Sequence, residues 1–224
     1  MRVHIAEACG FCYGVRRAVE LASTAEKGTH TLGPIIHNPQ LVNSLSARGV
    51  SPVDSLQDVA DGSKVLIRSH GVGPHVYEEA EAKHLDVVDA TCPHVKKAQQ
   101  DARKVINDKK ALIIVGEKDH PEVISISQWG CNRAIIIDKV EEAKEIPYCE
   151  HMGVVVQTTF SKSRFKQIES VLAEKTDDLD VYMTICTATR QRQEAAVELA
   201  KKVDAMIVIG GKNSANTGRL AQVC

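Results

Sequence analysis

Short apolar runs alternate with helix-favouring segments along most of the chain, and a polar turn follows nearly every run. The runs are 3–6, 64–68, 86–89, 111–115, 134–137, 153–156, 181–185 and 205–209. Apolar runs of this length, separated by amphipathic helical patterns, are typical of parallel β-strands in an α/β protein. The sequence therefore predicts an α/β fold with mostly parallel sheets. Ligands in such folds bind in the loops after the carboxyl ends of the strands.

Three of the seven cysteines lie where an apolar run or a turn gives way to a helical pattern. Cys12 stands between two glycines, Cys92 precedes a proline suited to a first helical turn, and Cys186 follows the run 181–185. Backbone N–H groups and the dipole at a helix start lower the pKa of a thiol and favour the thiolate. We expect Cys92 to bind iron and the other polar motifs to converge on it, although spacing alone assigns no metal to thiols from separate turns.

The three cysteines recur at similar intervals, which predicts three similar α/β units, each presenting one thiol to a common centre. We expect the first unit at 13–92, the second at 93–185 and an incomplete third at 186–224. The third unit is expected to be joined by an N-terminal strand within 1–12. No low-complexity linker separates the units, so we expect them to pack closely.

Cys9 leaves two alternatives open. With the other three thiolates it would complete four ligands and close an iron–sulfur or zinc site, as in a non-catalytic sensor. With Cys12 it forms a CxxC pair, as in a thiol redox protein. No motif surrounds Cys131 or Cys149, and both are expected to be small buried apolar side chains.

Three histidines occupy turns beside glycine or proline at strand ends. They are His37, His70 and His120. Together they could bind zinc, but their neighbours suit donation of hydrogen bonds to a phosphate. The segment 213–217 follows two glycines and opens a helical pattern, which favours a second anion-binding element. It lacks the lysine of a P-loop.

Glu122 is the acidic residue embedded in these motifs. Beside His120 and near a site of low dielectric constant, its pKa is expected to be raised so that it can deliver protons. A carboxylate that only stabilises a helix start is the alternative. Thr158 and Thr159 are expected either to orient a substrate hydroxyl or to cap the next helix.

Charge and composition exclude several functions. The formal net charge is -1 and aromatic residues make up 4% of the chain, so no global field or stacking surface for nucleic acid is expected. The N-terminus has neither signal-peptide nor transit-peptide character, and no window has the roughly 20 apolar residues of a membrane span. We therefore expect a cytoplasmic enzyme with no membrane partner.

With these residues laid out, the chain resembles the 4-hydroxy-3-methylbut-2-enyl diphosphate reductases of the non-mevalonate isoprenoid pathway. The resemblance runs from Gly10 to Leu220. It rests on the motifs at 10–18, 33–39, 68–72, 89–93, 120–123, 157–159, 186–189 and 213–217.

The resemblance implies an oxidoreductase with three α/β domains around a cavity that holds a 4Fe-4S cluster. Cys12, Cys92 and Cys186 would be the three protein ligands, which leaves Cys9 outside and the fourth iron open. The implied reaction is reductive dehydroxylation of the allylic diphosphate to isopentenyl diphosphate and dimethylallyl diphosphate. The implied electron donor is a ferredoxin or flavodoxin.

The resemblance also implies roles for the remaining motifs. The three histidines would hold the diphosphate together with Ser214 and Asn216, and Glu122 would supply a proton with Thr158 or Thr159 nearby. Ala215 stands where the family commonly has a second serine. The family continues beyond the position of Cys224 with a further serine-bearing turn, so we expect a shortened chain with weaker substrate affinity than a full-length relative.

Overall fold

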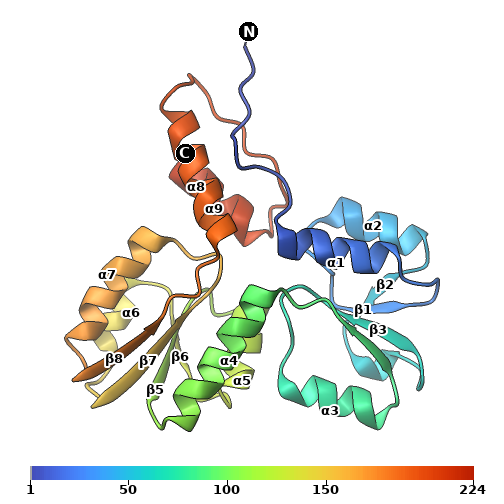
Figure 1. The fold of residues 1–224 in the computed structure, drawn as a ribbon, viewed down its shortest axis with the longest axis horizontal. Helices are drawn as coiled ribbons and strands as arrows, with labels where there is room; N and C mark the ends of the chain where they lie inside the picture. Colours follow the sequence, from blue (N-terminus) through green and yellow to red (C-terminus); the bar gives the residue numbers. More distant parts are fainter. Residues whose placement is uncertain (1) are drawn as a thin grey trace.

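The computed structural model describes residues 2–224, and two four-stranded parallel sheets organise that part of the chain (Figure 1). The first contains β1 (His30–Leu32), β2 (Ser51–Val53), β3 (Lys64–Ile67) and β4 (Asp86–Asp89), in the order β2-β1-β3-β4. The second contains β5 (Ala111–Val115), β6 (Ile135–Ile137), β7 (His151–Val156) and β8 (Asp178–Tyr182), in the order β6-β5-β7-β8. The predicted α/β class with parallel sheets is confirmed.

Helices cover both faces of the first sheet. Helices α1 (Tyr13–Ser23) and α2 (Pro39–Ala47) bury Ala18 and Leu45 against one face. The short helix η1 (Leu56–Asp58) and α3 (Pro74–Ala82) bury Leu56 and Ala80 against the other. The buried residues of α1 are the small Gly14, Ala18 and Ala22, which allow this helix to lie close to the sheet. The first turn of α1 follows Cys12, so this packing also positions that thiol.

The second sheet is covered in the same manner. Helices α4 (Pro93–Asn107) and α5 (Pro121–Trp129) pack Val105 and Ile126 on one face. Helices α6 (Val140–Glu145) and α7 (Lys162–Ala173) pack Ala143 and Phe165 on the other. Burying a side chain such as Phe165 contributes on the order of 2 kcal/mol, so this three-layer packing fixes the loops at the strand ends.

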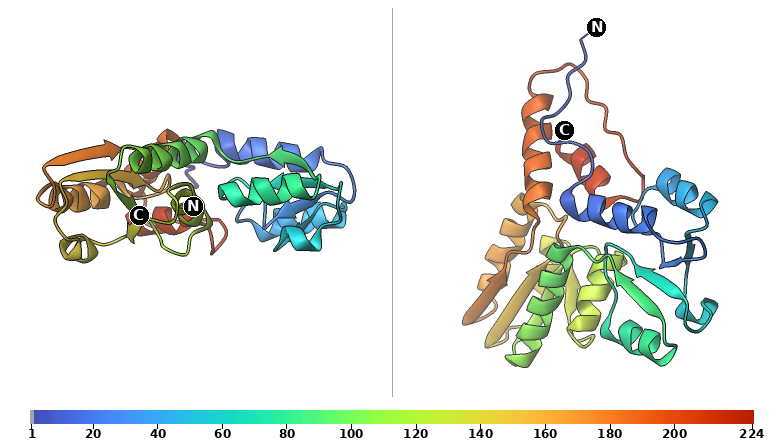
Figure 2. Two further views of the ribbon diagram at one scale, coloured as in Figure 1. Left: turned by 90° about the horizontal axis from the view of Figure 1, so that it is seen from below. Right: turned by 45° about the vertical axis from the view of Figure 1, so that its right-hand side comes forward.

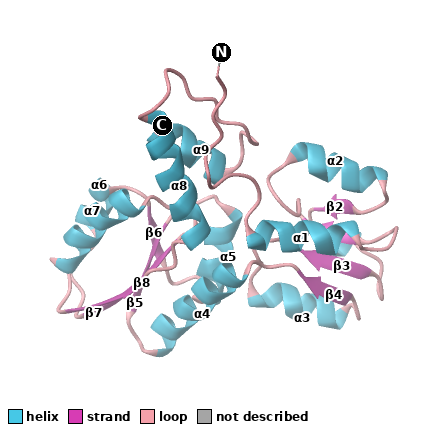
Figure 3. Cartoon of the chain, turned by 45° about the horizontal axis from the view of Figure 1, so that its top comes forward, coloured by secondary structure: helices cyan, strands magenta, loops and turns pink. Residues whose placement is uncertain are grey.

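The chain after β8 is helical, which corrects part of the sequence prediction. Helices α8 (Thr187–Ala200) and α9 (Ala215–Val223) are joined by an extended segment. Neither 3–6 nor 205–209 forms a strand, and Figure 3 draws both as loop. Ile207 and Ile209 are 84% and 91% exposed, because no neighbouring strand pairs with this segment in residues 2–224. We propose that 186–224 is nevertheless a third structural unit.

Two further differences concern strand positions. The last strand of the second sheet lies at 178–182 rather than 181–185. Strands β1 and β2 were not anticipated. Pro52 weakens the strand pattern of β2, and the proline is tolerated because β2 is at the edge of its sheet. None of the helices in residues 2–224 combines the length and the apolar character needed to cross a bilayer.

The two sheets share one strand order, second-first-third-fourth, so each has a switch point between its first and third strands. Ligands of doubly wound sheets bind in the crevice outside such a point. The loops after β1, β3 and β5 carry His37, His70 and His120, and Thr158 follows β7. Helices α1, α4 and α8 begin near the middle of the molecule, as Figures 1 and 2 show.

Candidate active site

The three thiols singled out from the sequence occupy equivalent local positions. Cys12, Cys92 and Cys186 are the N-cap residues of α1, α4 and α8. Cys92 and Cys186 also follow the fourth strands of their respective sheets. Thiolate charge on either Cys12 or Cys186 acts on Cys92 and raises its pKa, so the structure brings the three together around one centre.

The first turn of α1 packs directly against Cys92. A Cβ placed on Gly14 would lie 2.5 Å from Sγ of Cys92, so this position has no room for a side chain. Three residues further on in α1, Arg17 donates hydrogen bonds to the backbone oxygens of Asp89 and Thr91, at 3.0 and 3.3 Å. These contacts hold α1 against the turn that carries Cys92.

The acidity of Cys92 differs from the sequence expectation. Backbone N–H groups of His94 and Val95 do lower its pKa, as expected for a helix start. Burial outweighs this effect and raises the pKa of Cys92, and thiolate charge on Cys12 and Cys186 raises it further. In the protein without a bound cation, Cys92 is therefore a thiol at neutral pH.

The other cysteines differ in burial from one another and from the sequence expectation. Cys9 and Cys131 are exposed, and Cys149 is half-buried against the core of the second sheet. The expectation that Cys131 is buried is wrong: the chain turns there with φ of 56° and carries the side chain to the surface.

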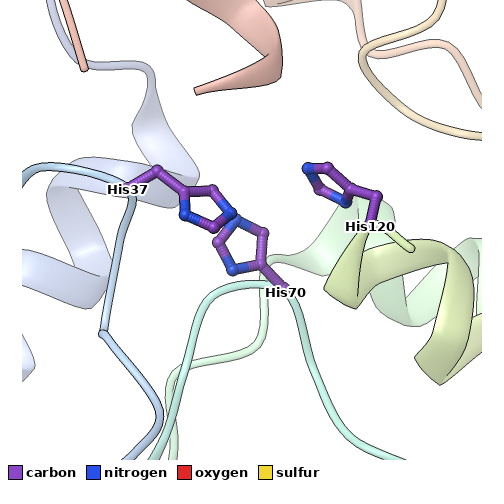
Figure 4. Close-up of side chains that lie close together, drawn as sticks. All are labelled: His37, His70 and His120. Carbon is purple, nitrogen blue, oxygen red and sulfur yellow. The ribbon is translucent and has the colours of Figure 1, made fainter. Parts of the chain in front are cut away.

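The three histidines meet between the two sheets. Their ring centroids are 4.4 Å apart for His37 and His70, 5.6 Å for His37 and His120, and 5.4 Å for His70 and His120. Figure 4 shows the rings converging from three separate loops. The loops after β1 and β3 are joined because Ser69 donates to the backbone oxygen of Ile35 at 3.1 Å.

Each of the three rings keeps at least one nitrogen that is not hydrogen-bonded within the described part of the chain. His120 accepts from the backbone N–H of Glu122 through Nδ1 at 3.2 Å, so its proton resides on Nε2 when the ring is neutral. Nε2 of His37 and Nδ1 of His70 are buried and have no hydrogen-bond partner among residues 2–224. Buried polar atoms without partners are costly, and a bound anion would remove that cost.

All three histidines are neutral at pH 7. Burial lowers the pKa of His120 to about 4, and the charge of a protonated His37 and of Arg68 acts in the same direction. Burial followed by the Arg68 charge lowers the pKa of His37. The pKa of His70 lies well below its ordinary value, chiefly through burial. Arg68 had no assigned role in the sequence, although it stands in the motif that contains His70.

The same rings are arranged as metal ligands are. One nitrogen from each histidine lies within 4.8 Å of those of the other two, which is compatible with a Zn²⁺ ion. Zinc-binding histidines usually donate their second N–H to a carboxylate or carbonyl. In the described part of the chain the partners of His37 and His120 are instead an amide side chain and a backbone N–H.

Glu122 lies in the first turn of α5, 2% exposed, and Thr158 binds both of its oxygens. The backbone N–H of Thr158 donates to Oε1 at 2.6 Å, and its hydroxyl to Oε2 at 2.9 Å. Burial raises the pKa of Glu122 to about 7 although both hydrogen bonds from Thr158 lower it. The expectation of a raised pKa is confirmed.

The remaining predicted residues are engaged elsewhere. The Thr159 hydroxyl accepts from Gln157 at 3.0 Å, and Ser214 caps α9 by accepting from the N–H of Thr217 at 3.4 Å. Asn216 accepts from Thr189 on α8 at 3.5 Å. None of these bonds is to a histidine of the cluster.

Asn213 belongs to the predicted anion-binding segment 213–217 but was given no individual role, and it contacts the histidine cluster. Its Nδ2 lies 3.4 Å from Nδ1 of His37. A Cβ on Gly211 would lie 2.6 Å from the backbone oxygen of His37, so a glycine there permits this approach. His37, His120 and Asn213 line a cavity of 560 Å³ that extends over the end of β6.

A sequence model of the LytB protein family matches residues 3–224. The chain is 45% identical over 227 residues to a 4-hydroxy-3-methylbut-2-enyl diphosphate reductase of Pelobacter propionicus. It is 46% identical over 227 residues to the reductase of the same name from Trichlorobacter lovleyi. Both alignments cover the whole of this chain and 81% of the relative.

Solved structures agree with these sequence matches. The reductase from Plasmodium falciparum superposes with a TM-score of 0.90 at 29% identity, covering 96% of this chain and 70% of that one. Another structure is described as (E)-4-hydroxy-3-methyl-but-2-enyl diphosphate reductase, the terminal enzyme of the non-mevalonate pathway. It superposes with a TM-score of 0.76 at 42% identity, covering 99% and 81%.

Proposed function

The chain belongs to the LytB protein family, and on that premise we propose that it is an enzyme that reductively removes the hydroxyl of 4-hydroxy-3-methylbut-2-enyl diphosphate. The products would be isopentenyl diphosphate and dimethylallyl diphosphate. The reaction consumes two electrons and two protons and releases one water. The observation that carries the proposal is that three neutral histidines meet near a buried, protonatable Glu122 and the thiol-bearing turns. The backbone N–H of Cys92 donates to the oxygen of Ser69, next to His70, and that of Cys186 to the oxygen of Thr158, which binds Glu122.

In this proposal the histidines hold the diphosphate. Neutral imidazoles donate hydrogen bonds to phosphate oxygens from a partly buried site, and the bonds from His37 and His70 satisfy buried nitrogens that otherwise lack a partner. Arg68 adds a nearby fixed positive charge, because its field reaches all three rings. Asn213 orients His37, and Ser214 and Asn216 line the far side of the diphosphate.

Glu122 delivers a proton at the reacting end of the substrate. With a pKa of about 7 it is present in both protonation states near neutral pH, as a general acid requires. Because the Thr158 hydroxyl lies 2.9 Å from Oε2, a proton can pass from the carboxyl group through this hydroxyl. Thr159 supports this arrangement from the next position through its contact with Gln157.

The thiol centre fits an iron–sulfur cluster. Three thiols at three helix N-caps supply three soft ligands. Burial is the main cause of the raised pKa of Cys92, and the further rise from thiolates at Cys12 and Cys186 is a repulsion that a cation would relieve. We assign Cys12, Cys92 and Cys186 as ligands of a 4Fe-4S cluster. When bound, it supplies electrons singly and leaves one iron without a protein ligand. A ferredoxin or flavodoxin is the proposed electron donor.

The alternative of a sensor with four protein ligands is less well supported. It needs Cys9 as a fourth ligand, and Cys9 is exposed while the charges that act on Cys92 come from Cys12 and Cys186. It also gives no role to the buried pair of Glu122 and Thr158.

Turnover under anaerobic conditions tests the proposal. The reconstituted protein, supplied with a chemical reductant and 4-hydroxy-3-methylbut-2-enyl diphosphate, should release both C5 diphosphates, detected by mass spectrometry. An iron-loaded protein that binds the diphosphate and releases neither product would overturn the proposed activity.

A further inference from the structure

A buried polar contact between the two halves of the site lies outside every motif discussed so far. Ser125, on α5 and 1% exposed, points its hydroxyl at the loop after β3. Its Oγ lies 3.0 Å from the backbone oxygen of His70 and 2.9 Å from that of Glu122. One hydroxyl thus contacts a histidine loop of the first sheet and the acid-bearing turn of the second.

Gln99 fixes the orientation of that hydroxyl. It lies on α4, the helix capped by Cys92, and is 4% exposed. Its Nε2 donates to Oγ of Ser125 at 3.2 Å and approaches the backbone oxygen of Val72 at 3.5 Å. With an amide N–H donating to Oγ, the single hydroxyl proton of Ser125 is left for the two backbone oxygens.

The loop is shaped to receive these two side chains. Gly71 has φ of 72°, and a Cβ there would lie 2.4 Å from Nε2 of Gln99. One turn beyond Ser125, Trp129 donates from Nε1 to the backbone oxygen of Val72 at 2.9 Å. The loop 70–73 is therefore bound to α4 and α5 through backbone oxygens, which makes its position depend on those helices.

We propose that Ser125 and Gln99 are positioning residues that set the distance between the phosphate-binding histidines and the acid Glu122. The inference rests on the proposed function and extends it to two residues that do not touch substrate. The three elements that they join carry Cys92, His70 and Glu122, each from a different part of the reaction centre. A substrate bound by its diphosphate at His70 can be protonated only if that distance is kept.

The test uses the reconstituted enzyme and inorganic pyrophosphate as the probe. Ser125→Ala removes the shared hydroxyl, and Gln99→Met removes the amide at nearly constant volume. Each variant should weaken pyrophosphate binding in calorimetry by about tenfold, the effect of roughly one misplaced hydrogen bond. The double variant should lose little more than either single variant, because the two side chains act as one unit.

A second readout separates positioning from folding. Ser125→Thr retains the hydroxyl and should recover most of the affinity, whereas Ser127→Ala, two residues along the same helix, should behave as wild type. Variants that lower only the unfolding midpoint, with wild-type pyrophosphate affinity and wild-type kcat and KM, would overturn the positioning role. Failure of the wild type itself to bind pyrophosphate or turn over would instead overturn the proposed function.

Discussion

Thr158 donates two hydrogen bonds to Glu122, one from its backbone N–H and one from its hydroxyl, at 2.6 and 2.9 Å. A fully buried carboxyl is thus held by a single residue from the neighbouring loop. Both bonds favour the ionised form, and burial favours the protonated form. Their balance determines the acidity on which the proposed proton transfer depends.

The stability of the folded protein should depend on pH through Glu122. The folded protein holds the Glu122 proton up to a pKa of about 7, and the unfolded chain releases it near 4.5. The stabilisation from this proton is complete below pH 4.5 and is lost as pH rises through 7, by roughly 3 kcal/mol in all. Glu122→Gln should remove this decline in urea unfolding curves and abolish turnover, whereas the surface variant Glu141→Gln should change neither.

Removal of the Thr158 hydroxyl should move the pH profile of turnover. Thr158→Ala deletes a bond that lowers the pKa of Glu122, so the pKa rises further and the alkaline limb of kcat moves to higher pH. Thr158→Ser should keep the wild-type profile. An identical shift in Thr159→Ala would contradict the distinction between the two threonines.

The cysteine assignment predicts which variants retain iron. Cys12→Ser, Cys92→Ser and Cys186→Ser should each lose the 4Fe-4S signal in Mössbauer and absorption spectra. Cys9→Ser should retain it, because Cys9 is exposed. Zinc in place of iron after anaerobic purification, or loss of the cluster in Cys9→Ser, would contradict the assignment.

Diphosphate binding should take up protons. The histidine pKa values are lowered in the free site, and an anion bound at the rings raises them again. Affinity for pyrophosphate should therefore fall as pH rises above about 4, the pKa of His120 in the free site. Calorimetry in two buffers of different ionisation enthalpy measures the uptake directly, and His120→Asn should reduce it. A binding enthalpy independent of the buffer would count against this role.

Gly14 is predicted to be irreplaceable. The Cβ of Gly14→Ala would lie 2.5 Å from Sγ of Cys92, and overpacking of this kind costs about 1–3 kcal/mol. We expect lower stability in thermal unfolding and reduced iron content. Gly218→Ala in α9 is the matched control: its Cβ meets nothing within 4 Å, so it should be neutral or stabilising by about 1 kcal/mol.

Local patterns in the sequence predicted much of the site, because its principal residues lie at strand ends and helix starts. Cys92 and His120 can be recognised in this way, since a proline follows each and each caps a helix. The contact of Ser125 with His70 and that of Asn213 with His37 could not be recognised, because the partners lie far away in sequence. These contacts form only in the folded protein, where the two sheets and the loop before α9 come together.

Local sequence patterns also could not show which apolar segments become strands of a sheet. The segments 111–115 and 205–209 look alike as apolar runs, yet only the first is a strand. A strand requires partners for its backbone N–H and C=O groups, and Ile114 has them on both sides whereas Ile209 has none in residues 2–224. The pKa of Cys92 illustrates the same point, because burial could not be read from its turn.

The common strand order of the two sheets gives the reaction centre a pseudo-symmetric scaffold with unlike chemistry on its two sides. Loops after the first strands supply His37 and His120, loops after the third supply His70 and Thr158, and turns after the fourth supply Cys92 and Cys186. Each half supplies one residue at each of these three positions, but two of the three histidines belong to the first half and the proposed proton donor Glu122 belongs to the second. A rigid-body rotation between the halves would therefore switch the enzyme off without altering a single side chain.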